Sequence, residues 1–257
     1  MGLPRRLGQH FLARNSILEK LAEAVCGEYV ERLIEIGPGR GALTKHLLPH
    51  VGELHAVELD DALVHYLQRE FASEPKLQVH RADILEIDLS QWGAAAIAGN
   101  LPYYITSPIV RKFLALDERF PVAVFLVQRE VANRLLAVPG TRDYGYMTVA
   151  TQLICDVELV CHVPASAFSP PPKVESAAVR LIRKRVALTN LRELLTFAGR
   201  CFAQKRKTLR NNLRPFYGAA IDKLPEAGLR AEQLSVEQFQ ELLARLGNSS
   251  TFEPPVH

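Results

Sequence analysis

The segment Glu35-Ile36-Gly37-Pro38-Gly39-Arg40-Gly41-Ala42-Leu43-Thr44 joins a short apolar run to a helical pattern, and it is the clearest guide to the architecture. Its glycines allow positive φ and let a ligand approach the backbone closely, because no Cβ intervenes. A glycine-rich turn between a strand and a helix is typical of nucleotide-binding α/β domains. The alternative is a turn that serves packing alone.

Around this segment, apolar runs of strand length alternate with helical patterns from residue 33 to residue 128. Such alternation predicts a parallel sheet with helices on both faces. We expect Ser107 to cap one of the helices, with Pro108 at its first position. The predicted strands cover residues 33–37, 54–59, 77–80, 94–99 and 122–128, and the predicted helices cover residues 41–49, 61–71, 107–116, 130–137 and 147–155.

The rest of the chain extends the sheet and then becomes helical. Strands near residues 157–162 and 176–182 flank a proline-rich link and should form an antiparallel return at the sheet edge. After about residue 187 the pattern is helical throughout. We therefore predict an α/β domain at residues 1–186 and a small all-helical domain at residues 187–257.

Composition favours a cytoplasmic globular protein. The chain has 257 residues, of which 48% are hydrophobic and 23% are charged, as in ordinary soluble domains. No apolar run approaches the roughly 18 residues that a membrane span needs, and residues 1–12 lack the apolar core of a signal peptide. The four cysteines form no pair of C-x-x-C motifs, so we expect reduced thiols, no metal and no membrane partner.

Basic residues are concentrated in one segment. Residues 180–214 contain eleven basic residues and one acid, Glu193, so the segment carries +10 while the whole chain carries +3. Arg206, Arg210 and Arg214 recur every four residues and would form one cationic stripe on a helix. Such a stripe can track the phosphates of a polyanion, although a charge run is also typical of a solvated face. The candidate binding residues are Lys205, Arg206, Lys207, Arg210 and Arg214.

Two kinds of cofactor fit the glycine-rich turn. Gly37 and Gly39 match a dinucleotide fingerprint, and Glu58 lies 21 residues after Gly37, where its carboxylate could hold a ribose diol. An NAD-dependent enzyme is therefore one hypothesis. Asp83 closes the third predicted strand, where it could accept a hydrogen bond from a cofactor adenine, which favours S-adenosylmethionine. An Asp in this place is also an ordinary turn or cap residue.

The tetrapeptide Asn100-Leu101-Pro102-Tyr103 follows the apolar run at residues 94–98 and thus ends a predicted strand. The amino group of adenine is a poor nucleophile, because its lone pair is delocalised into the ring. A site that methylates it must accept hydrogen bonds from the amine and hold the base flat, which an Asn oxygen, a neighbouring carbonyl and a Tyr ring can do. An Asn before a proline turn can also be purely structural. A hydride-transfer enzyme has no evident use for this tetrapeptide.

Seven motifs occur in a characteristic order along nearly the whole chain. They are Gly8-Gln9-His10-Phe11-Leu12, Glu35-Ile36-Gly37-Pro38-Gly39-Arg40-Gly41, Val57-Glu58-Leu59-Asp60, Asn100-Leu101-Pro102-Tyr103-Tyr104, Gln128-Arg129-Glu130-Val131-Ala132, Phe168-Ser169-Pro170-Pro171-Pro172-Lys173-Val174 and Phe202-Ala203-Gln204-Lys205-Arg206-Lys207-Thr208-Leu209. Each motif is weak alone, but together they are specific. From about Leu7 to Leu246 the chain closely resembles the ribosomal RNA adenine N6-dimethyltransferase family of the KsgA type.

The resemblance implies a Rossmann-like class I methyltransferase domain that uses S-adenosylmethionine, followed by a helical domain. Glu58 would take the ribose hydroxyls and Asp83 the adenine amine of the cofactor. The family often has Asn where this chain has His10. The implied cofactor contacts are His10, Leu12, Gly37, Glu58, Asp83 and Asn100, to which the glycine-rich turn adds Gly39.

The resemblance also implies how the target base is held. Asn100 and the Leu101 carbonyl would orient the target amine, and Tyr103 with Phe168 would sandwich the adenine. The methyl transfer would be a direct in-line displacement, in which the protein positions and polarises the reactants.

The implied substrate is the 3′ end of 16S ribosomal RNA in an immature small subunit, where two adjacent adenines would be dimethylated by a monomeric enzyme. The basic segment would dock the RNA. One alternative is a non-catalytic assembly factor, and another is a methyltransferase that acts on large-subunit RNA and confers antibiotic resistance. The Pro170-Pro171-Pro172-Lys173 link and residues 205–211 favour the small-subunit branch.

Overall fold

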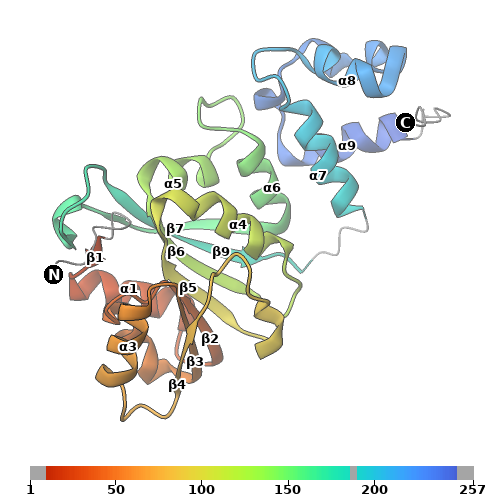
Figure 1. Ribbon diagram of the computed structural model, residues 1–257. Helices are drawn as coiled ribbons and strands as arrows, with labels where there is room; N and C mark the ends of the chain where they lie inside the picture. The colour runs from red at the N-terminus through yellow and green to blue at the C-terminus, as the bar shows by residue number, and fades with distance from the viewer. Residues whose placement is uncertain (1–9, 186–189, 248–257) are drawn as a thin grey trace. The chain divides into compact units, whose positions relative to one another are not determined.

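The computed structural model describes residues 10–185 and 190–247, which form two compact units (Figure 1). The sheet unit takes the described residues up to Ala132 together with Asp156–Arg183. The helical unit takes Asn133–Cys155 and the described residues from Lys184 onward. The predicted domain boundary, between residues 186 and 187, lies outside the described residues, and residues 133–155 group by their contacts with the later helices.

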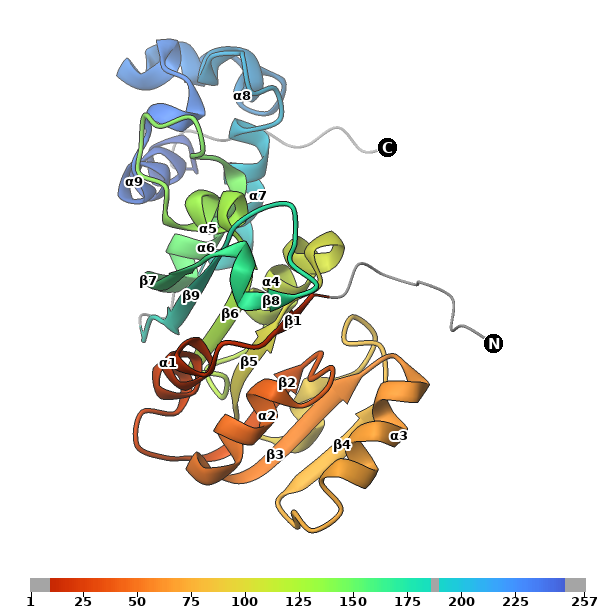
Figure 2. The same cartoon turned by 90° about the vertical axis from the view of Figure 1, so that its left-hand side faces the viewer.

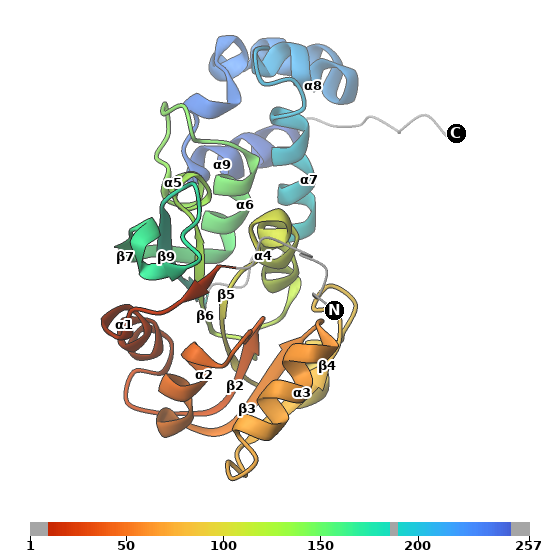
Figure 3. The same ribbon diagram turned by 60° about the vertical axis from the view of Figure 1, so that its left-hand side comes forward.

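The sheet has seven strands in the order β4-β3-β2-β5-β6-β9-β7. The first five run parallel to their neighbours, and β9 runs antiparallel to β6. The predicted parallel sheet with an antiparallel return is thereby confirmed, with β7 at the edge beside β9 (Figure 3). The strands are β2 (Val30–Ile36), β3 (Val51–Glu58), β4 (Leu77–Arg81), β5 (Ala96–Asn100), β6 (Val122–Gln128), β7 (Cys155–Val163) and β9 (Ser176–Arg183).

Two strands begin earlier than their apolar runs predict. Both β2 and β3 start three residues before the predicted positions, with Val30 opposite Val51. Arg32 and Glu53 interrupt the apolar pattern, but they face each other across the two strands, and their side chains form an ion pair at 2.8 Å. Each of these charged residues thus finds its partner on the neighbouring strand, so the strands can continue past positions that interrupt the apolar pattern of the sequence.

Three helices cover one face of the sheet. They are α1 (Asn15–Cys26), α2 (Ala42–Leu47) and α3 (Asp61–Glu70), and Figure 2 shows α2 and α3 beside β3 and β4. Their apolar residues share one buried core with β2, β3, β5 and β6. The helix α1 was not predicted, although Ile17, Leu18 and Leu21 are buried at helical spacing.

The helix α4 (Thr106–Ala115) begins earlier than predicted. Its N-cap is Ile105 rather than Ser107, and Pro108 is the third helical residue rather than the first. A proline is tolerated there, because the first backbone N–H groups of a helix have no intrahelical acceptor. The Thr106 hydroxyl donates to the Pro102 carbonyl at 3.1 Å, which ties the start of α4 to the preceding turn. The helix α5 (Arg129–Leu136) follows β6 directly.

A second, two-stranded sheet joins distant parts of the chain. Strand β1 (Phe11–Leu12) pairs antiparallel with β8 (Phe168–Ser169), with Leu12 opposite Phe168 (Figure 2). This pairing, which the sequence did not predict, places the N-terminal segment and the proline-rich link side by side.

The helical unit contains α6 (Tyr146–Ile154), α7 (Leu191–Cys201), α8 (Leu209–Tyr217) and α9 (Val236–Gly247). Its core includes Phe197, Leu213 and Phe239, none more than 1% exposed. The predicted helical pattern of this region is confirmed. No helix in the described parts of the chain is long and apolar enough to cross a membrane.

The strand order places a crevice at the centre of the sheet. From β2 the chain moves outward to β3 and β4, then returns to β5 on the other side of β2. Connections that diverge from neighbouring parallel strands leave a crevice at the carboxyl ends of those strands. The glycine-rich turn after β2 and Asn100 at the end of β5 therefore meet at this crevice.

Candidate active site

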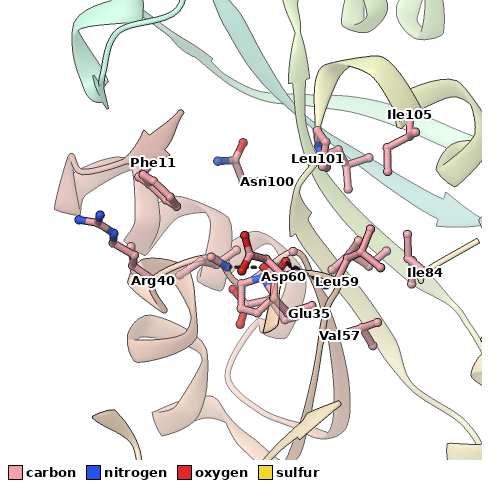
Figure 4. Close-up of a pocket in the computed structure, with 18 of the residues that line it drawn as sticks. Phe11, Glu35, Arg40, Val57, Leu59, Asp60, Ile84, Asn100, Leu101 and Ile105 are labelled. Carbon is pink, nitrogen blue, oxygen red and sulfur yellow. Dashed lines mark hydrogen bonds between the residues drawn. The ribbon is translucent and has the colours of Figure 1, made fainter. Parts of the chain in front are cut away.

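The crevice holds a pocket of about 880 Å³, formed entirely by the sheet unit (Figure 4). Asn100 projects into it from the end of β5, with Phe11 and Arg40 on one side and Leu59 and Ile84 on the other (Figure 4). The structure brings together here nine of the ten predicted catalytic and cofactor residues: His10, Leu12, Gly37, Gly39, Glu58, Asp83, Asn100, Leu101 and Tyr103.

The glycine-rich turn is shaped by positions that exclude a side chain. Gly39 has φ +59°, and a Cβ there would lie 3.0 Å from the ring of Phe11 in β1. Gly41 caps α2 with φ +76°, and a Cβ there would lie 2.5 Å from the ring of Phe71. The turn is thus packed closely against Phe11 and Phe71, and its residues Gly37 to Arg40 line the pocket.

Glu58 is held rigidly at the end of β3. Its carboxylate accepts hydrogen bonds from the backbone N–H groups of Gly39 at 3.1 Å, Leu59 at 2.9 Å and Asp60 at 3.1 Å. The residue is only 7% exposed. An ionised carboxylate has about four lone-pair sites, so acceptor capacity remains for a ligand hydroxyl. This geometry fits the predicted contact with a ribose diol.

Glu35, which the sequence did not single out as functional, lies beneath the glycine turn. It is 1% exposed and accepts a hydrogen bond of 2.6 Å from the Thr44 hydroxyl. Burial raises the pKa of Glu35 to about 7. The hydrogen bond from Thr44 lowers this pKa and the nearby charge of Glu58 raises it, but both effects are smaller than that of burial. The signal in the sequence is an acidic residue inside the otherwise apolar run at residues 33–37.

Asp83 is a turn residue whose side chain also lines the pocket. One carboxylate oxygen accepts from the Leu85 backbone N–H at 2.8 Å, as a turn residue does. The residue also lines the pocket beyond β4. The turn therefore fixes a carboxylate where a cofactor amine can reach it.

The amide of Asn100 has a fixed orientation. Its Nδ2 donates to the carbonyl of His10 at 3.1 Å. A carbonyl can only accept, so the amide must turn its NH₂ group toward His10, and Oδ1 stays available as an acceptor. The next residue, Leu101, is 1% exposed, and its N–H donates to Leu126 in β6 at 3.0 Å. Both predicted acceptors of the target amine are thus anchored to neighbouring segments.

Tyr103 and His10 form one wall of the pocket. The Tyr103 hydroxyl shares a hydrogen bond of 2.8 Å with Ser176, and burial raises the pKa of this phenol. The His10 ring is nearly parallel to that of Tyr103, with 6.0 Å between centroids. His10 Nδ1 lies 2.7 Å from the carbonyl of Pro170 and donates to it. His10 therefore connects the N-terminal segment, the Asn100 turn and the proline-rich link.

Phe168 is the predicted site residue that does not reach the pocket lining. It lies in β8, is 4% exposed and packs in the core of the sheet unit. The predicted sandwich of an adenine between Tyr103 and Phe168 is not assembled in this conformation, and it stays a prediction.

The predicted basic stripe is wrong in one respect. The helix α8 begins after Thr208, so Arg206 lies in the preceding turn, and only Arg210 and Arg214 share a helix. The buried Asn212 holds this turn by donating to the carbonyls of Cys201 at 2.7 Å and Gln204 at 3.2 Å. The exposed residues Lys205, Arg206 and Lys207 form the tip of this turn.

Arg210 and Arg214 share an acidic partner that sequence analysis missed. Asp222 pairs with Arg210 at 2.8 Å and with Arg214 at 3.8 Å. Asp222 lies in a later 3₁₀ turn, so only the folded helical unit brings it to α8.

The fold and the site select one class of enzyme. Enzymes that use NAD share the glycine turn and the acidic residue after the second strand, but the two anchored neutral acceptors at Asn100 and Leu101 suit methylation of an amine. The sheet unit is a Rossmann-like, S-adenosylmethionine-dependent methyltransferase domain. A family model described as ribosomal RNA adenine dimethylase matches residues 3–247, and the chain belongs to this family.

Individual relatives agree over nearly the whole chain. A "Ribosomal RNA small subunit methyltransferase A" from Thiobacillus denitrificans is 41% identical, over 96% of this chain and 99% of the relative. A dimethyladenosine transferase from Plasmodium falciparum has a TM-score of 0.82 at 27% identity, over 93% of this chain and 98% of its own. The 23S rRNA methyltransferase ErmE has a TM-score of 0.75 at 28% identity, over 92% of this chain and 99% of its own.

Proposed function

We propose that the protein transfers methyl groups from S-adenosylmethionine to the N6 amines of two adjacent adenines near the 3′ end of 16S ribosomal RNA, giving N6,N6-dimethyladenosine. The observation that carries this proposal is the anchored acceptor pair at the pocket, Asn100 Oδ1 and the Leu101 carbonyl. The small-subunit substrate is supported by the full-length similarity to small-subunit methyltransferases.

The pocket residues fit the methyl donor. The turn at Gly37 and Gly39 leaves the backbone open to the pocket, the Glu58 carboxylate is preorganised for the ribose hydroxyls, and Asp83 can accept from the adenine amine. When bound, S-adenosylmethionine supplies an activated methyl group on a sulfonium centre. The protein therefore needs no covalent nucleophile, and its task is to place the amine.

The target amine would be oriented by the acceptor pair. Two acceptors on the amino group draw its N–H bonds into the pocket wall and leave the nitrogen lone pair directed at the methyl group. Tyr103, held by Ser176, would support one face of the base. An adenine reaches such a pocket only after it leaves its stack, which favours single-stranded or incompletely folded RNA.

The proposal extends to partners and location. The substrate would be an immature small ribosomal subunit in the cytoplasm, and the enzyme would act as a monomer without a metal. The predicted domain at residues 187–257, whose described residues belong to the helical unit, would dock RNA through Lys205, Arg206, Lys207, Arg210 and Arg214. All five side chains are exposed, as phosphate contacts require.

Methylation of unmethylated small subunits, free 16S RNA and large subunits would test the proposal, with the modified positions mapped by mass spectrometry. We expect dimethyladenosine in small subunits only. Asn100→Ala should abolish it while thermal unfolding is unchanged, and Asn133→Ala, the same change at an exposed site on α5, should be neutral. Methylation of large subunits, or binding of small subunits without methylation, would reject the proposal in favour of a resistance enzyme or an assembly factor.

A further inference from the structure

Tyr104 presents an exposed aromatic ring at the rim of the pocket. It lines the pocket, yet it is 59% exposed. It belongs to the 3₁₀ turn Tyr103–Ile105 that directly follows Asn100-Leu101-Pro102. In the part of the chain that the structure describes, its side chain makes no hydrogen bond and no ring contact.

Tyr104 and its neighbour Tyr103 have different surroundings. Successive residues in a 3₁₀ helix point about 120° apart, so the two rings face different directions. Tyr103 is fixed by Ser176 and lies beside His10, whereas Tyr104 faces solvent. Singly exposed aromatic residues are common on proteins, so it is the position next to the acceptor pair that sets Tyr104 apart.

An RNA whose target adenine has been unstacked could bind an exposed aromatic ring at this place. An adenine that leaves its stack uncovers a face of the adjoining base, and an aromatic side chain can replace the lost stacking partner. We propose that Tyr104 stacks on the nucleobase next to the target adenine and so positions the RNA at the pocket. This inference rests on the proposed function, and it makes Tyr104 a positioning residue.

Two cationic side chains of the pocket lining, Arg40 and Arg81, have contacts within the protein. The Arg40 guanidinium lies 5.0 Å from the centre of the Phe11 ring, and Arg81 is paired with Asp61. The Tyr104 ring itself is uncharged, so the contact that it offers to the RNA is a flat aromatic surface. Binding through Tyr104 should accordingly be insensitive to salt, unlike binding through phosphate contacts.

The chain provides a matched control in Tyr29. This residue is 55% exposed, but it precedes β2 at the amino end of the strand and does not line the pocket. Tyr29→Ala removes a ring of equal size and similar exposure without touching the proposed contact.

The test measures affinity for unmethylated small subunits across a salt titration, together with the KM and kcat of methyl transfer. Tyr104→Ala should weaken binding and raise the KM by about 5- to 150-fold, the effect of losing one base stack. The loss should be equal at all salt concentrations. Tyr104→Phe and Tyr29→Ala should stay within about twofold of wild type. S-adenosylmethionine affinity by calorimetry and thermal unfolding should be unchanged in all three variants.

Wild-type affinity and KM in Tyr104→Ala would overturn the inference, provided that the wild-type protein methylates the subunits. An equal loss in Tyr104→Phe would also overturn it, because the hydroxyl and not the ring would then make the contact. If the wild-type protein does not methylate small subunits, it is the proposed function that fails.

Discussion

Glu35 should make the stability of this protein fall as the pH rises from about 4.5 to about 7, and Glu35→Gln should abolish that effect. Burial raises the pKa of Glu35 from 4.5 to about 7. Below pH 4.5 the carboxyl group is protonated in both the folded and the unfolded chain, so it makes no difference to stability. Between pH 4.5 and 7 the unfolded chain releases the proton while the folded chain keeps it, so ionisation favours unfolding.

The size of the effect follows from the shift. At about 1.4 kcal/mol per pH unit, the loss is about 1 kcal/mol at pH 5 and about 3 kcal/mol at pH 8, where both states are ionised. The amide introduced by Glu35→Gln would be neutral at every pH and could still accept the hydrogen bond from Thr44. The stability difference between variant and wild type should thus move by about 2 to 3 kcal/mol in favour of Glu35→Gln between pH 5 and pH 8.

Urea unfolding at pH 5 and pH 8 measures this difference, because all other titrating groups are common to both proteins and cancel. Glu28→Gln, the same change at an exposed position, should show no such dependence. A pH-independent difference between Glu35→Gln and wild type would refute the conclusion that burial keeps this carboxyl protonated. It would mean that folding does not raise the pKa of Glu35 above its value in the unfolded chain.

Three further substitutions test other parts of the structure. Glu58→Ala should weaken S-adenosylmethionine binding by about 1 to 3 kcal/mol, as calorimetry would show, and NAD should bind neither protein; unchanged affinity would contradict the assigned contact. Gly41→Ala should lower the free energy of unfolding by about 2 to 5 kcal/mol, because the residue has φ +76° and its Cβ would meet the Phe71 ring. Unchanged stability in urea unfolding would contradict the steric conflict expected at Gly41. Asp222→Asn should strengthen RNA binding and steepen its salt dependence, because it frees Arg210 from its ion pair. Weaker RNA binding, or a salt dependence equal to that of the wild type, would show that Arg210 does not contact phosphates.

The sequence by itself determined the sheet and most of the site. The central strands β2, β3, β5 and β6 each contain a mostly apolar run, and such a run is a local property, so a short window of sequence contains the signal. Of the candidate site residues, Glu58 and Asn100 end their strands, and Asp83 follows shortly after β4. Since the carboxyl ends of parallel strands meet at one edge, residues at these positions had to converge, and the pocket was predictable without knowledge of the packing.

Tertiary structure decided the orientation of the groups and the pairings between distant segments. His10 and Pro170 are 160 residues apart, and their hydrogen bond exists only because β1 and β8 pair. The same pairing accompanies the burial of Phe168, and the nearby His10 carbonyl directs the Asn100 amide. The position at which α8 begins and the ion pair between Arg210 and Asp222 likewise depend on how the helical unit folds. The periodicity of the sequence indicates which face of a helix or strand is apolar. The contacts described here depend on which distant segment covers that face, and a local window of the sequence does not contain this information.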